Sequence, residues 1–520
     1  MKLVSVAEMV AIEQEANAAG LSYVQMMENA GRALVDVLLE EYGYLEEEGA
    51  LGLIGSGNNG GDTLIALDCL AHEGWKCSAY LLRPRPENDP LIARLLESGG
   101  KIIFGENDPD TSILITLLDS HGLLLDGILG TGFRLPLKPE LAQILKSTRT
   151  SLMSMSNPPA VVAVDCPSGV DCDSGESAPE CLSAEMTVTM AAYKQGLFKF
   201  PAHELAGEIR LVPIGLPGEG EALSAWRQVR SFIPEIKWVR GCLPDRPASS
   251  HKGSFGTAVI AAGSIQYTGA AWLAGQAAYR VGTGLVTLAV PRSLHAVLAG
   301  HFSEATWLPL PEEDGAISRE AASVIHRNLD RATSLLVGPG LGLAESTGEF
   351  IRDLLTGGKL PPLVIDADGL KLLTRISNWP DLLPPQSVLT PHPGEMSVLT
   401  GIPAAEIQSQ RLELARRMSK EWNQVLVLKG AFTVVSAPDG ATTVIPIATP
   451  ALARAGTGDV LAGLVAGLLA QGVPAFEAAV AGAWIHAQAG MWAAQDIGNS
   501  ASVLAGDVLN SVSQIITELQ

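Results

Sequence analysis

Strand-like and helix-like segments alternate along this chain in two long series. Near the start, residues 6–20 and 26–43 carry apolar side chains at helical spacing, and Ser5 with Glu8 forms a capping-box pattern. We expect these two helices to precede the first strand. From residue 50 the alternation becomes regular, with strand patterns at 51–56 and 76–84 and helix patterns at 63–74 and 89–100. This rhythm predicts a parallel sheet covered by helices.

The first series ends near residue 217, and a second begins at residue 256. The first continues through strand patterns at 122–130 and 160–169, and closes with 187–194 and 208–217. Residues 216–253 contain Pro, Gly and charge without a sustained period, which is typical of a linker and docking segment. We therefore expect two domains, residues 1–220 and 221–520.

The second series has the same character. Strand patterns are predicted at 256–264, 286–290, 334–340, 362–369, 387–392 and 425–430, between helix patterns at 269–282, 349–358 and 404–422. Two strongly apolar helices follow residue 459, and their small residues suit close packing. The pattern predicts another three-layer α/β domain.

Composition narrows the class of protein. The chain has 520 residues, 47% of them hydrophobic, which is ample for two cores. The formal net charge of −21 repels nucleic acids and anionic membranes, and no basic run offsets it. Anionic ligands would therefore have to be bound by local amides and single cations. Glycine-rich loops are the places to look for such binding.

The cysteines and the N-terminus indicate a reducing compartment. Six cysteines are scattered with no CxxC pair, so we interpret them as free thiols. The first ten residues have no apolar signal-peptide core, and the longest apolar run, near 460–470, is too short to cross a bilayer. We expect a cytoplasmic protein.

The loop Gly55-Ser56-Gly57-Asn58-Asn59-Gly60-Gly61-Asp62 follows a strand and opens a helix. Successive amides at a helix N-terminus can hold a phosphate. The loop is neither a P-loop nor a GxGxxG motif, and such turns also occur without any ligand. Phosphate binding and a merely tight turn both remain open at this point.

Polar side chains follow two further strands of the first series. Asp126 lies in LLLDGILGTG, and Asp165 lies in VVAVDCPSG, three residues before Ser168. The carboxyl ends of parallel strands meet at one edge of a sheet, so these groups and Asn59 could converge on a cation as oxygen donors. The alternative is that Asp126 and Asp165 only cap their turns.

GSGNNGGD, DGILGTG and VDCPSG, in this order, resemble the NAD(P)H-hydrate epimerase domain family over most of residues 1–217. The resemblance implies potassium ligation by Asn59, Asp126 and Ser168, and an acid or base role for Asp165. It implies substrate binding by Asn58, Asn59, Gly60, Gly61 and Asp62, by Gly130, Thr131, Gly132, Phe133, Arg134, Leu135 and Pro136, and by Asp165.

One residue departs from the family pattern. The family's loop commonly has Gly after the aspartate, whereas this chain has Thr63, which we expect to cap the helix without abolishing binding. The family also includes non-catalytic interaction modules. Retention of both Asp126 and Asp165 favours catalysis.

In the second half, Gly456-Thr457-Gly458-Asp459 precedes an apolar helix. Amides at such an N-terminus can stabilise a transferring phosphoryl group, and Asp459 could take a proton from a substrate hydroxyl. An ordinary capped helix start remains the alternative for so short a segment.

GPGLG at 338–342, DADGL at 366–370, TPHPGE at 390–395 and VLKGAFT at 427–433 occur at successive predicted strand ends. Together with GTGD, they resemble the ribokinase-like superfamily over about residues 235–515, specifically its ADP/ATP-dependent NAD(P)H-hydrate dehydratase branch. The resemblance implies that Ala270, Gly342, His392 and Asp459 contact the substrate, with Asp459 catalytic, and that Lys429, Gly430, Ala431, Phe432, Thr433 and Gly458 bind the nucleotide.

The two resemblances predict one fold class and one pathway. The fold would be α/β, with an N-terminal Rossmann-like three-layer α/β/α domain followed by a C-terminal ribokinase-like α/β/α domain. The first would interconvert the R and S forms of hydrated NADH and NADPH (NADHX and NADPHX), using K⁺. The second would dehydrate the S form at the expense of ADP or ATP with Mg²⁺, because phosphorylating the C6 hydroxyl makes it a good leaving group.

One alternative function stays open. A ribokinase-like small-molecule kinase with a non-catalytic nucleotide-binding N-terminal module would share GTGD but would release a stable phosphorylated product. The HPGE segment and the fused first domain speak against it. We expect small-molecule partners only, with neither nucleic acid nor membrane, and a homo-oligomer.

Overall fold

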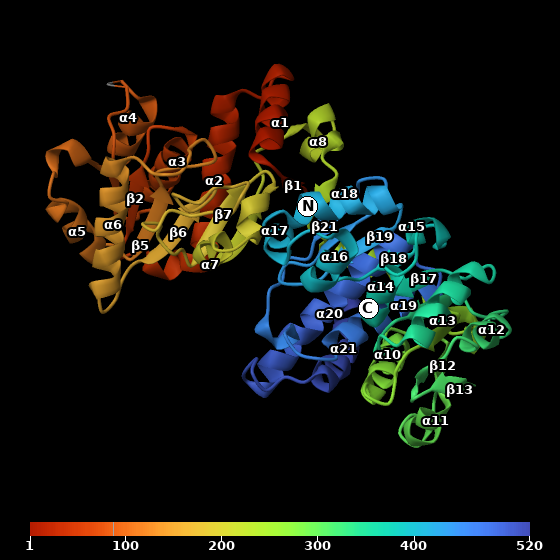
Figure 1. The fold of residues 1–520 in the computed structure, drawn as a ribbon. Helices are drawn as coiled ribbons and strands as arrows, with labels where there is room; N and C mark the ends of the chain where they lie inside the picture. The colour runs from red at the N-terminus through yellow and green to blue at the C-terminus, as the bar shows by residue number, and fades with distance from the viewer. Residues whose placement is uncertain (87) are drawn as a thin grey trace. The chain divides into compact units, whose positions relative to one another are not determined.

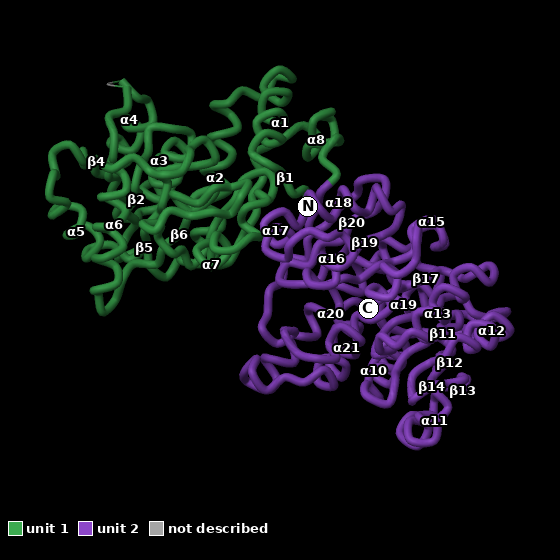
Figure 2. The backbone as a smooth tube through the Cα atoms, viewed as in Figure 1, with its two compact units in different colours: residues 1–230 green, residues 231–520 purple. Residues whose placement is uncertain are grey.

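The computed structural model describes residues 1–86 and 88–520. The chain forms two compact units, residues 1–230 and 231–520 (Figure 1, Figure 2). This boundary lies after the residue 220 that we expected, because residues 221–230 pack in the first unit. The amides of Ser224 and Ala225 donate to Glu15 of helix α1 (Val6–Ala18), and Trp226 is buried in the first unit's core.

The first unit is built on one parallel seven-stranded sheet in the order β4-β3-β2-β5-β6-β7-β9. Every neighbouring pair in it is parallel, as the alternating pattern predicts. Its strands are β2 (Ala50–Ile54), β3 (Cys77–Leu81), β4 (Lys101–Phe104), β5 (Leu123–Gly127), β6 (Ala160–Val164), β7 (Met186–Met190) and β9 (Glu208–Val212).

Helices cover both faces of this sheet because alternate strand residues point to opposite sides. In β2, Ala50 and Ile54 belong to one buried apolar cluster, while Leu51 and Leu53 belong to another. The three-layer arrangement predicted from the sequence is therefore confirmed. The helices are α1, α2 (Tyr23–Tyr42), α3 (Asn58–His72), α4 (Pro90–Glu97), α5 (Ser112–Asp119), α6 (Pro139–Ser154), α7 (Ala202–Ala206) and α8 (Ser224–Gln228).

The chain begins differently from our expectation. The predicted capping box is present, with the Ser5 hydroxyl and the Glu8 carboxylate each accepting from the other's backbone amide. A two-residue strand, β1 (Leu3–Val4), nevertheless precedes α1 and pairs in parallel with β8 (Tyr193–Lys194). The expectation that no strand precedes the first helices was wrong, because two residues are too few to carry a period.

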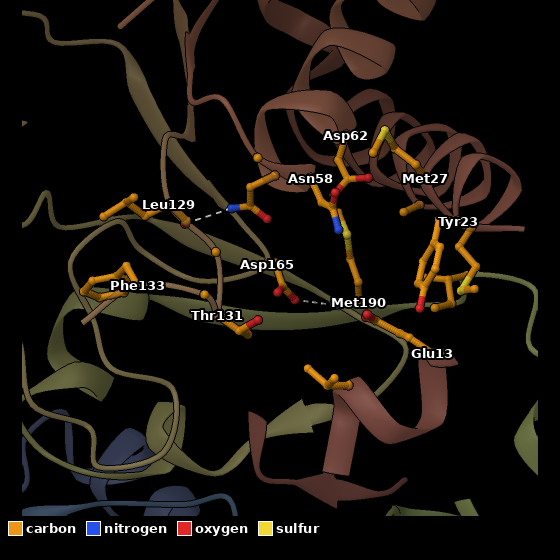
Figure 3. Close-up of a pocket in the computed structure, with 18 of the residues that line it drawn as sticks. Glu13, Tyr23, Met27, Asn58, Asp62, Leu129, Thr131, Phe133, Asp165 and Met190 are labelled. Carbon is orange, nitrogen blue, oxygen red and sulfur yellow. Dashed lines mark hydrogen bonds between the residues drawn. The ribbon is translucent and has the colours of Figure 1, made fainter. Parts of the chain in front are cut away.

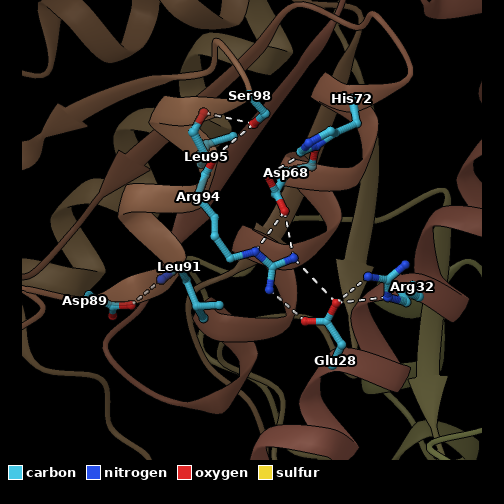
Figure 4. Close-up of polar contacts among 9 residues, drawn as sticks. All are labelled: Glu28, Arg32, Asp68, His72, Asp89, Leu91, Arg94, Leu95 and Ser98. Atoms are coloured by element: carbon cyan, nitrogen blue, oxygen red, sulfur yellow. Dashed lines mark hydrogen bonds and ion pairs between the residues drawn. The ribbon is translucent and has the colours of Figure 1, made fainter.

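An ion-pair network joins α2, α3 and α4 on the outside of the first unit (Figure 4). Arg94 of α4 lies 2.8 Å from Glu28 of α2 and 2.7 Å from Asp68 of α3. Asp68 is buried, whereas Arg94 keeps about a third of its side chain exposed. Arg94 therefore supplies the compensating charge that a buried carboxylate needs.

The second unit contains a ten-stranded sheet in the order β10-β21-β20-β19-β18-β17-β16-β11-β12-β13. The pairs β19–β20 and β20–β21 are antiparallel and all the others are parallel. The strands are β10 (Ser231–Phe232), β11 (Thr257–Ala261), β12 (Leu285–Pro291), β13 (Thr306–Leu310), β16 (Ser334–Val337), β17 (Leu363–Ile365), β18 (Val388–Leu389), β19 (Val425–Leu428), β20 (Val434–Ser436) and β21 (Thr442–Val444). A small hairpin, β14 (Glu312–Glu313) and β15 (Ala316–Ile317), stands apart.

Thirteen helices of the second unit accompany this sheet in the described part of the chain, and the apolar helix after GTGD is central to its core. A Cβ atom added at Gly463 of α19 would lie 2.2 Å from the carbonyl oxygen of Ala274 in α10, so these helices touch backbone to backbone. The helices are α9 (Ile236–Cys242), α10 (Thr268–Arg280), α11 (Arg292–Ala299), α12 (Ala321–His326), α13 (Glu345–Thr356), α14 (Asp368–Leu373), α15 (Trp379–Leu382), α16 (Pro393–Thr400), α17 (Ala404–Ser409), α18 (Arg411–Trp422), α19 (Thr457–Ala470), α20 (Ala475–Ile497) and α21 (Ala505–Leu519).

No helix in residues 1–86 or 88–520 is both long and apolar enough to cross a membrane. The apolar character of α19 instead reflects its burial, since nearly all its residues are inaccessible to solvent. A helix that is apolar on all sides belongs in the interior of a domain.

Candidate functional sites

The glycine-rich loop of the first unit connects β2 directly to α3. Gly57 is the N-cap residue and Asn58 the first residue of the helix. A Cβ atom at Gly60 would lie 2.1 Å from the carbonyl oxygen of Gly55, so the loop folds back on itself at a distance that only glycine permits. The loop thus places a helix N-terminus at the carboxyl edge of the sheet, where open α/β sheets bind ligands.

Thr63 does not cap this helix, contrary to our expectation. It is fully buried inside α3, where its hydroxyl donates to the carbonyl oxygen of Asn59 at 2.7 Å. A Cβ atom at Gly127 would lie 1.8 Å from that hydroxyl oxygen. Thr63 therefore fills the space between α3 and the end of β5, and it acts through packing.

A cavity of about 500 Å³ opens beside the loop (Figure 3). Among the residues for which the family resemblance implies substrate binding, the following line it: Asn58, Asn59, Asp62, Gly130, Thr131, Gly132, Phe133 and Asp165. Gly60, Gly61, Arg134, Leu135 and Pro136 are not among its lining residues. The cavity also takes in residues that sequence reasoning missed, namely Val10, Glu13, Tyr23, Met26, Met27, Ala30, Ser56, Gly57, Ile128, Leu129, Met190, Lys194 and Ile214.

Asp165 occupies a strained backbone position at the end of β6, with a φ of 65°. Its Oδ1 atom accepts hydrogen bonds from the Thr189 hydroxyl at 3.2 Å, from the Met190 amide at 3.1 Å and from the Lys194 ammonium. Its Oδ2 atom has no hydrogen-bond partner in the described part of the chain. One oxygen is therefore fixed by three donors, while the other is available to a ligand.

Lys194 is the main functional candidate that the sequence did not reveal. Its side chain is only 2% exposed, and its ammonium donates to Asp165, to the Met190 carbonyl oxygen at 2.8 Å and to the Thr189 hydroxyl at 3.1 Å. A buried ammonium costs several kcal/mol unless it is paired, so this geometry holds Lys194 and Asp165 as an ion pair. A single lysine in AAYKQG carries no local signal of such a role.

The three residues that the sequence assigned to a cation converge behind the cavity. Asp126 accepts from the Ser168 amide at 2.8 Å and from the Ser168 hydroxyl at 2.5 Å, and both side chains are buried. The Leu129 amide donates to the Ser168 hydroxyl at 2.9 Å. Burial raises the pKa of the Asp126 carboxyl, and its hydrogen bonds to Ser168 oppose this shift.

Asn59 joins the same group from α3. Its side-chain nitrogen lies 2.9 Å from the Leu129 carbonyl oxygen and 2.5 Å from the Val164 carbonyl oxygen. The group therefore offers one carboxylate, one hydroxyl, one amide and two backbone carbonyls within a small volume. These are all hard oxygen donors except for the amide nitrogen, and the set suits a cation of low charge.

In the second unit, the carboxyl ends of three adjacent strands carry the predicted motifs. Asp366 follows β17, His392 follows β18 and Lys429 follows β19. Because neighbouring parallel strands end at the same edge of the sheet, their following residues meet there. The GTGD turn at the start of α19 supplies Asp459 to the same place.

Lys429 lies at the centre of this group. Its ammonium is 2.6 Å from Asp366 Oδ1 and 3.7 Å from Glu395 Oε2, and only 16% of its side chain is exposed. Burial lowers the pKa of Lys429, but the negative charges of Asp366, Glu395 and Asp459 raise it more. The pKa of Lys429 therefore lies above its usual value. A Cβ atom on Gly458 would lie 3.5 Å from this ammonium, so Lys429 sits directly beside the GTGD turn.

Asp459 is half-buried, and its environment disfavours the charged form. Burial and the nearby Asp366 raise the pKa of Asp459 to about 7, although Lys429 acts in the opposite direction. A carboxyl that titrates near neutrality can both accept and return a proton under ordinary conditions. This is the property that general-base catalysis requires.

His392 caps helix α16. Its Nδ1 atom accepts from the amides of Gly394 at 2.9 Å and Glu395 at 3.3 Å, so the ring proton must lie on Nε2, which faces Glu395 at 3.3 Å. Its side chain is 52% exposed. The ring is thus fixed by the helix and still presents one face to a ligand.

The remaining predicted residues of the second unit occupy three places. Gly342 has a φ of 79° and donates its amide to Asp368 at 3.0 Å, and it lines a cavity of about 510 Å³. Ala270 lies buried in α10. Gly430, Ala431, Phe432 and Thr433 form the turn after β19, in which Phe432 is buried and the Thr433 hydroxyl donates to the Gly430 carbonyl oxygen.

Comparison with known proteins gives matches over both units. Residues 258–514 match the family described as NAD(P)H-hydrate dehydratase, and residues 24–196 match the family described as YjeF-related protein N-terminus. The bifunctional NAD(P)H-hydrate repair enzyme of Moorella thermoacetica is 37% identical over 100% of this chain and 97% of its own length. That of Salinibacter ruber is 35% identical over 96% of this chain and 93% of its own.

A solved structure is also similar to the second unit. The ADP/ATP-dependent NAD(P)H-hydrate dehydratase from Bacillus subtilis, co-crystallised with ATP and Mg²⁺, is 31% identical to this chain. It covers 55% of this chain and 98% of its own, with a TM-score of 0.48.

Proposed function

This chain belongs to the bifunctional NAD(P)H-hydrate repair enzymes, with an epimerase domain followed by an ADP/ATP-dependent dehydratase domain, and on that premise we propose which residues perform each reaction. The first unit interconverts the R and S forms of hydrated NADH or NADPH. The second unit dehydrates the S form and consumes a nucleotide. Full-length similarity to enzymes of this name supports both halves.

In the first unit, the cavity beside α3 is the proposed epimerase site. The amides at the start of α3, with Asn58 and Asn59, bind the substrate's phosphates, because a helix N-terminus favours negative charge. The turn Gly130–Phe133 forms the opposite wall. In a chain with a net charge of −21, such local donors are what hold an anionic dinucleotide.

Asp165 is the proposed acid-base residue of this site, and Lys194 positions it. The three donors on Oδ1 orient the carboxylate and leave Oδ2 toward the cavity. A fixed, charged carboxylate can accept a proton from a substrate or water oxygen without reorganising.

A potassium ion fits the oxygen set behind the cavity. Asp126, Ser168 and Asn59 would hold it, together with the carbonyl oxygens of Leu129 and Val164. The Asn59 amide lies within hydrogen-bonding distance of both carbonyl oxygens, and turning it would place its oxygen on the side of the proposed ion. A bound cation would supply positive charge beside the glycine-rich loop that connects β2 to α3.

In the second unit, Asp459 is the proposed general base. It removes the proton of the substrate's C6 hydroxyl while that oxygen attacks the terminal phosphorus of ADP or ATP, and the amides of the GTGD turn stabilise the transferred charge. The phosphate then leaves from C6 as a proton leaves C5, which restores the dihydropyridine ring. The net products are NAD(P)H, inorganic phosphate and the shortened nucleotide.

Lys429 and Gly458 are proposed to hold the nucleotide's phosphates, with the turn Gly430–Thr433 beside them. Ala270, Gly342 and His392 would contact the hydrated dinucleotide. Mg²⁺ would enter with the nucleotide and take most of its ligands from phosphate oxygens and water, as this ion commonly does.

The observation that carries the dehydratase assignment is the position of Asp459, at a helix N-terminus beside Lys429 and Asp366. The test is recovery of NADH from a purified mixture of its hydrate epimers, with ADP, ATP or no nucleotide. Complete recovery with a nucleotide requires both activities. Recovery of only the S fraction would contradict the epimerase, and a stable phosphorylated hydrate would instead indicate a kinase.

Two expectations about the whole protein stay predictions. We propose a cytoplasmic location, which suits a substrate formed from cellular NADH and NADPH, and a homo-oligomeric state. Fractionation of the source cells tests the first, and light scattering of the purified chain tests the second.

A further inference from the structure

Asp62 is a buried carboxyl group in the epimerase cavity that no described residue satisfies. It lies in the second turn of α3, only 6% of the residue is exposed, and it lines the cavity. Within residues 1–86 and 88–520 its side chain forms neither a hydrogen bond nor an ion pair. A buried polar group without a partner in the protein is expected to meet one in the ligand.

Three carboxyl groups face the same space from different elements. Figure 3 shows Asp62 on α3, Asp165 after β6 and Glu13 on α1 around the cavity. Among the groups that shift the pKa of Asp62, Lys194 is the only cation. Its ammonium already donates hydrogen bonds to three other acceptors. Asp165 is therefore compensated, whereas Asp62 is not.

Burial raises the pKa of Asp62 well above its usual range, and the charges of Asp165 and Glu13 raise it further. Both effects favour the protonated form of Asp62, whereas the Asp165 carboxylate is paired with the Lys194 ammonium. Two carboxyl groups that share a cavity but differ in protonation state can serve as acid and base in one reaction.

We propose that Asp62 is the proton donor of the epimerisation and that Asp165 is its partner base, an inference that rests on the epimerase function proposed above. Asp62 protonates the C6 hydroxyl of the substrate, the C6–O bond breaks and water leaves, while the lone pair of N1 forms an N1–C6 double bond. C6 becomes planar and loses its configuration. Water then adds to the other face of C6, and Asp165 accepts the proton that this water loses.

Atoms, electrons and protons balance in this reaction without any other reactant. One water leaves and one enters, no atom is oxidised or reduced, and one proton passes from Asp62 to Asp165. Exchange with solvent returns both carboxyl groups to their starting states. The reverse epimerisation uses the same two groups with their roles exchanged, so that Asp165 donates and Asp62 accepts.

Neither neighbouring group is as well suited to donate the proton. Lys194 is fully buried, and its ammonium donates its three hydrogens to Asp165, Thr189 and Met190, so donation to the substrate would break the ion pair. Glu13 is only partly buried on α1, and although burial raises its pKa, Lys194 acts against that shift. Asp62 is the most deeply buried of the three carboxyl groups.

The test compares Asp62→Asn and Asp62→Glu with the wild type in the full-length protein. Rates of interconversion of the R and S hydrates are followed by chromatography across a pH series. We expect Asp62→Asn to lower kcat by about 10² to 10⁴, the usual loss for a general acid, with a much smaller change in KM. The wild-type rate should fall as pH rises through the titration of Asp62, and Asp62→Glu should restore part of the rate and this alkaline limb.

Two measurements separate catalysis from a structural role. Because ionisation of Asp62 opposes folding, Asp62→Asn should be at least as stable as the wild type at neutral pH, and its dehydration of pure S hydrate should be unchanged. In water enriched in heavy oxygen, each epimerisation should replace the C6 hydroxyl oxygen by a solvent oxygen. Asp36→Asn, an exposed carboxyl on α2, is the matched control and should behave as the wild type.

Three results would overturn the assignment. A fully active Asp62→Asn enzyme would exclude Asp62 as the acid. A raised KM with unchanged kcat would make it a binding residue only. Epimerisation with retention of the original oxygen would exclude cleavage of the C6–O bond. If the wild type itself does not epimerise, the proposed function fails instead, so the two failures are distinguishable.

Discussion

The ammonium of Lys429 lies 2.6 Å from Asp366 and beside Gly458, in a position to bridge the sheet edge and the start of α19. Asp366 is almost completely buried, and its Oδ1 atom also accepts from the Thr390 hydroxyl at 2.7 Å. The pair therefore holds a positive charge at the helix N-terminus where a transferred phosphoryl group would sit.

Lys429→Ala should weaken nucleotide binding more than substrate binding. Losing a charged hydrogen bond to phosphate costs about 1.5–3 kcal/mol, which corresponds to roughly a 10- to 100-fold rise in the KM for ADP. Titration with ADP at saturating S hydrate measures this change. Lys359→Ala, at an exposed lysine of the same unit, serves as the control. Unchanged ADP affinity would leave Lys429 with a structural role only.

Asp459→Asn should abolish dehydration and leave epimerisation intact, because the proposed base is lost while the other reaction is carried by the first unit. Loss of a general base typically reduces the rate by about 10² to 10⁴. The measurement is NADH formation from pure S hydrate with ADP, alongside chromatography of the R and S forms. Near-normal dehydration by this variant would show that another group removes the proton.

Dehydration should depend on pH with a midpoint near that of Asp459. Its pKa is raised to about 7, and a base acts only when deprotonated, so kcat should be low at acidic pH and rise as pH passes through this value. In Lys429→Ala the unpaired Asp366 would disfavour ionisation of Asp459 further, and the midpoint should move upward. A pH-independent kcat would indicate that a step other than proton removal limits the rate.

Asp126→Ala should slow epimerisation and remove its dependence on potassium. The remaining donors of the proposed site carry only partial charges, so they would hold a monovalent ion weakly. Epimer ratios are followed in buffers that contain potassium or only a bulky organic cation. Dehydration of pure S hydrate is the internal control and should not change. Equal rates in both buffers with an active variant would make Asp126 and Ser168 turn caps.

Arg94→Leu should destabilise the first unit by about 1–3 kcal/mol, because it leaves the buried Asp68 without its partner. The substitution also removes the hydrogen bond that lowers the pKa of Glu28. That part of the stability is present above the ordinary titration range of Glu and is lost as pH falls through the lowered pKa. Chemical denaturation at several pH values measures both effects.

Arg32→Leu is the matched control for Arg94. Arg32 also pairs with Glu28, at 2.7 Å, but its side chain is 64% exposed. Exposed ion pairs contribute about 0–1 kcal/mol, so this variant should remain close to the wild type. Equal losses for Arg32→Leu and Arg94→Leu would mean that burial of Asp68 does not matter to the unit.

Much of the fold was predictable because its information is local. Strands such as β2 and β6 are short, fully buried apolar runs, and the helices between them have their own spacing and caps. Elements with weak local patterns escaped detection. The two-residue strands β1 and β10 depend on partners distant in the chain, and the antiparallel pair β20 and β21 consists of strands of only three residues each.

By itself the sequence determined that Asp126 lies near the end of a strand, that Asp165 directly follows one, that Asp459 opens a helix, and that glycine-rich turns lie beside them. It could do so because a parallel α/β sheet places the residues after its strands at one edge. Only the tertiary structure brought Lys194 to Asp165, Lys429 to Asp366 and Glu13 into the cavity with Asp62. The two ion pairs join residues 29 and 63 positions apart, and Glu13 and Asp62 only line the same cavity. Which side chains meet is decided by sheet order and packing, not by any local pattern.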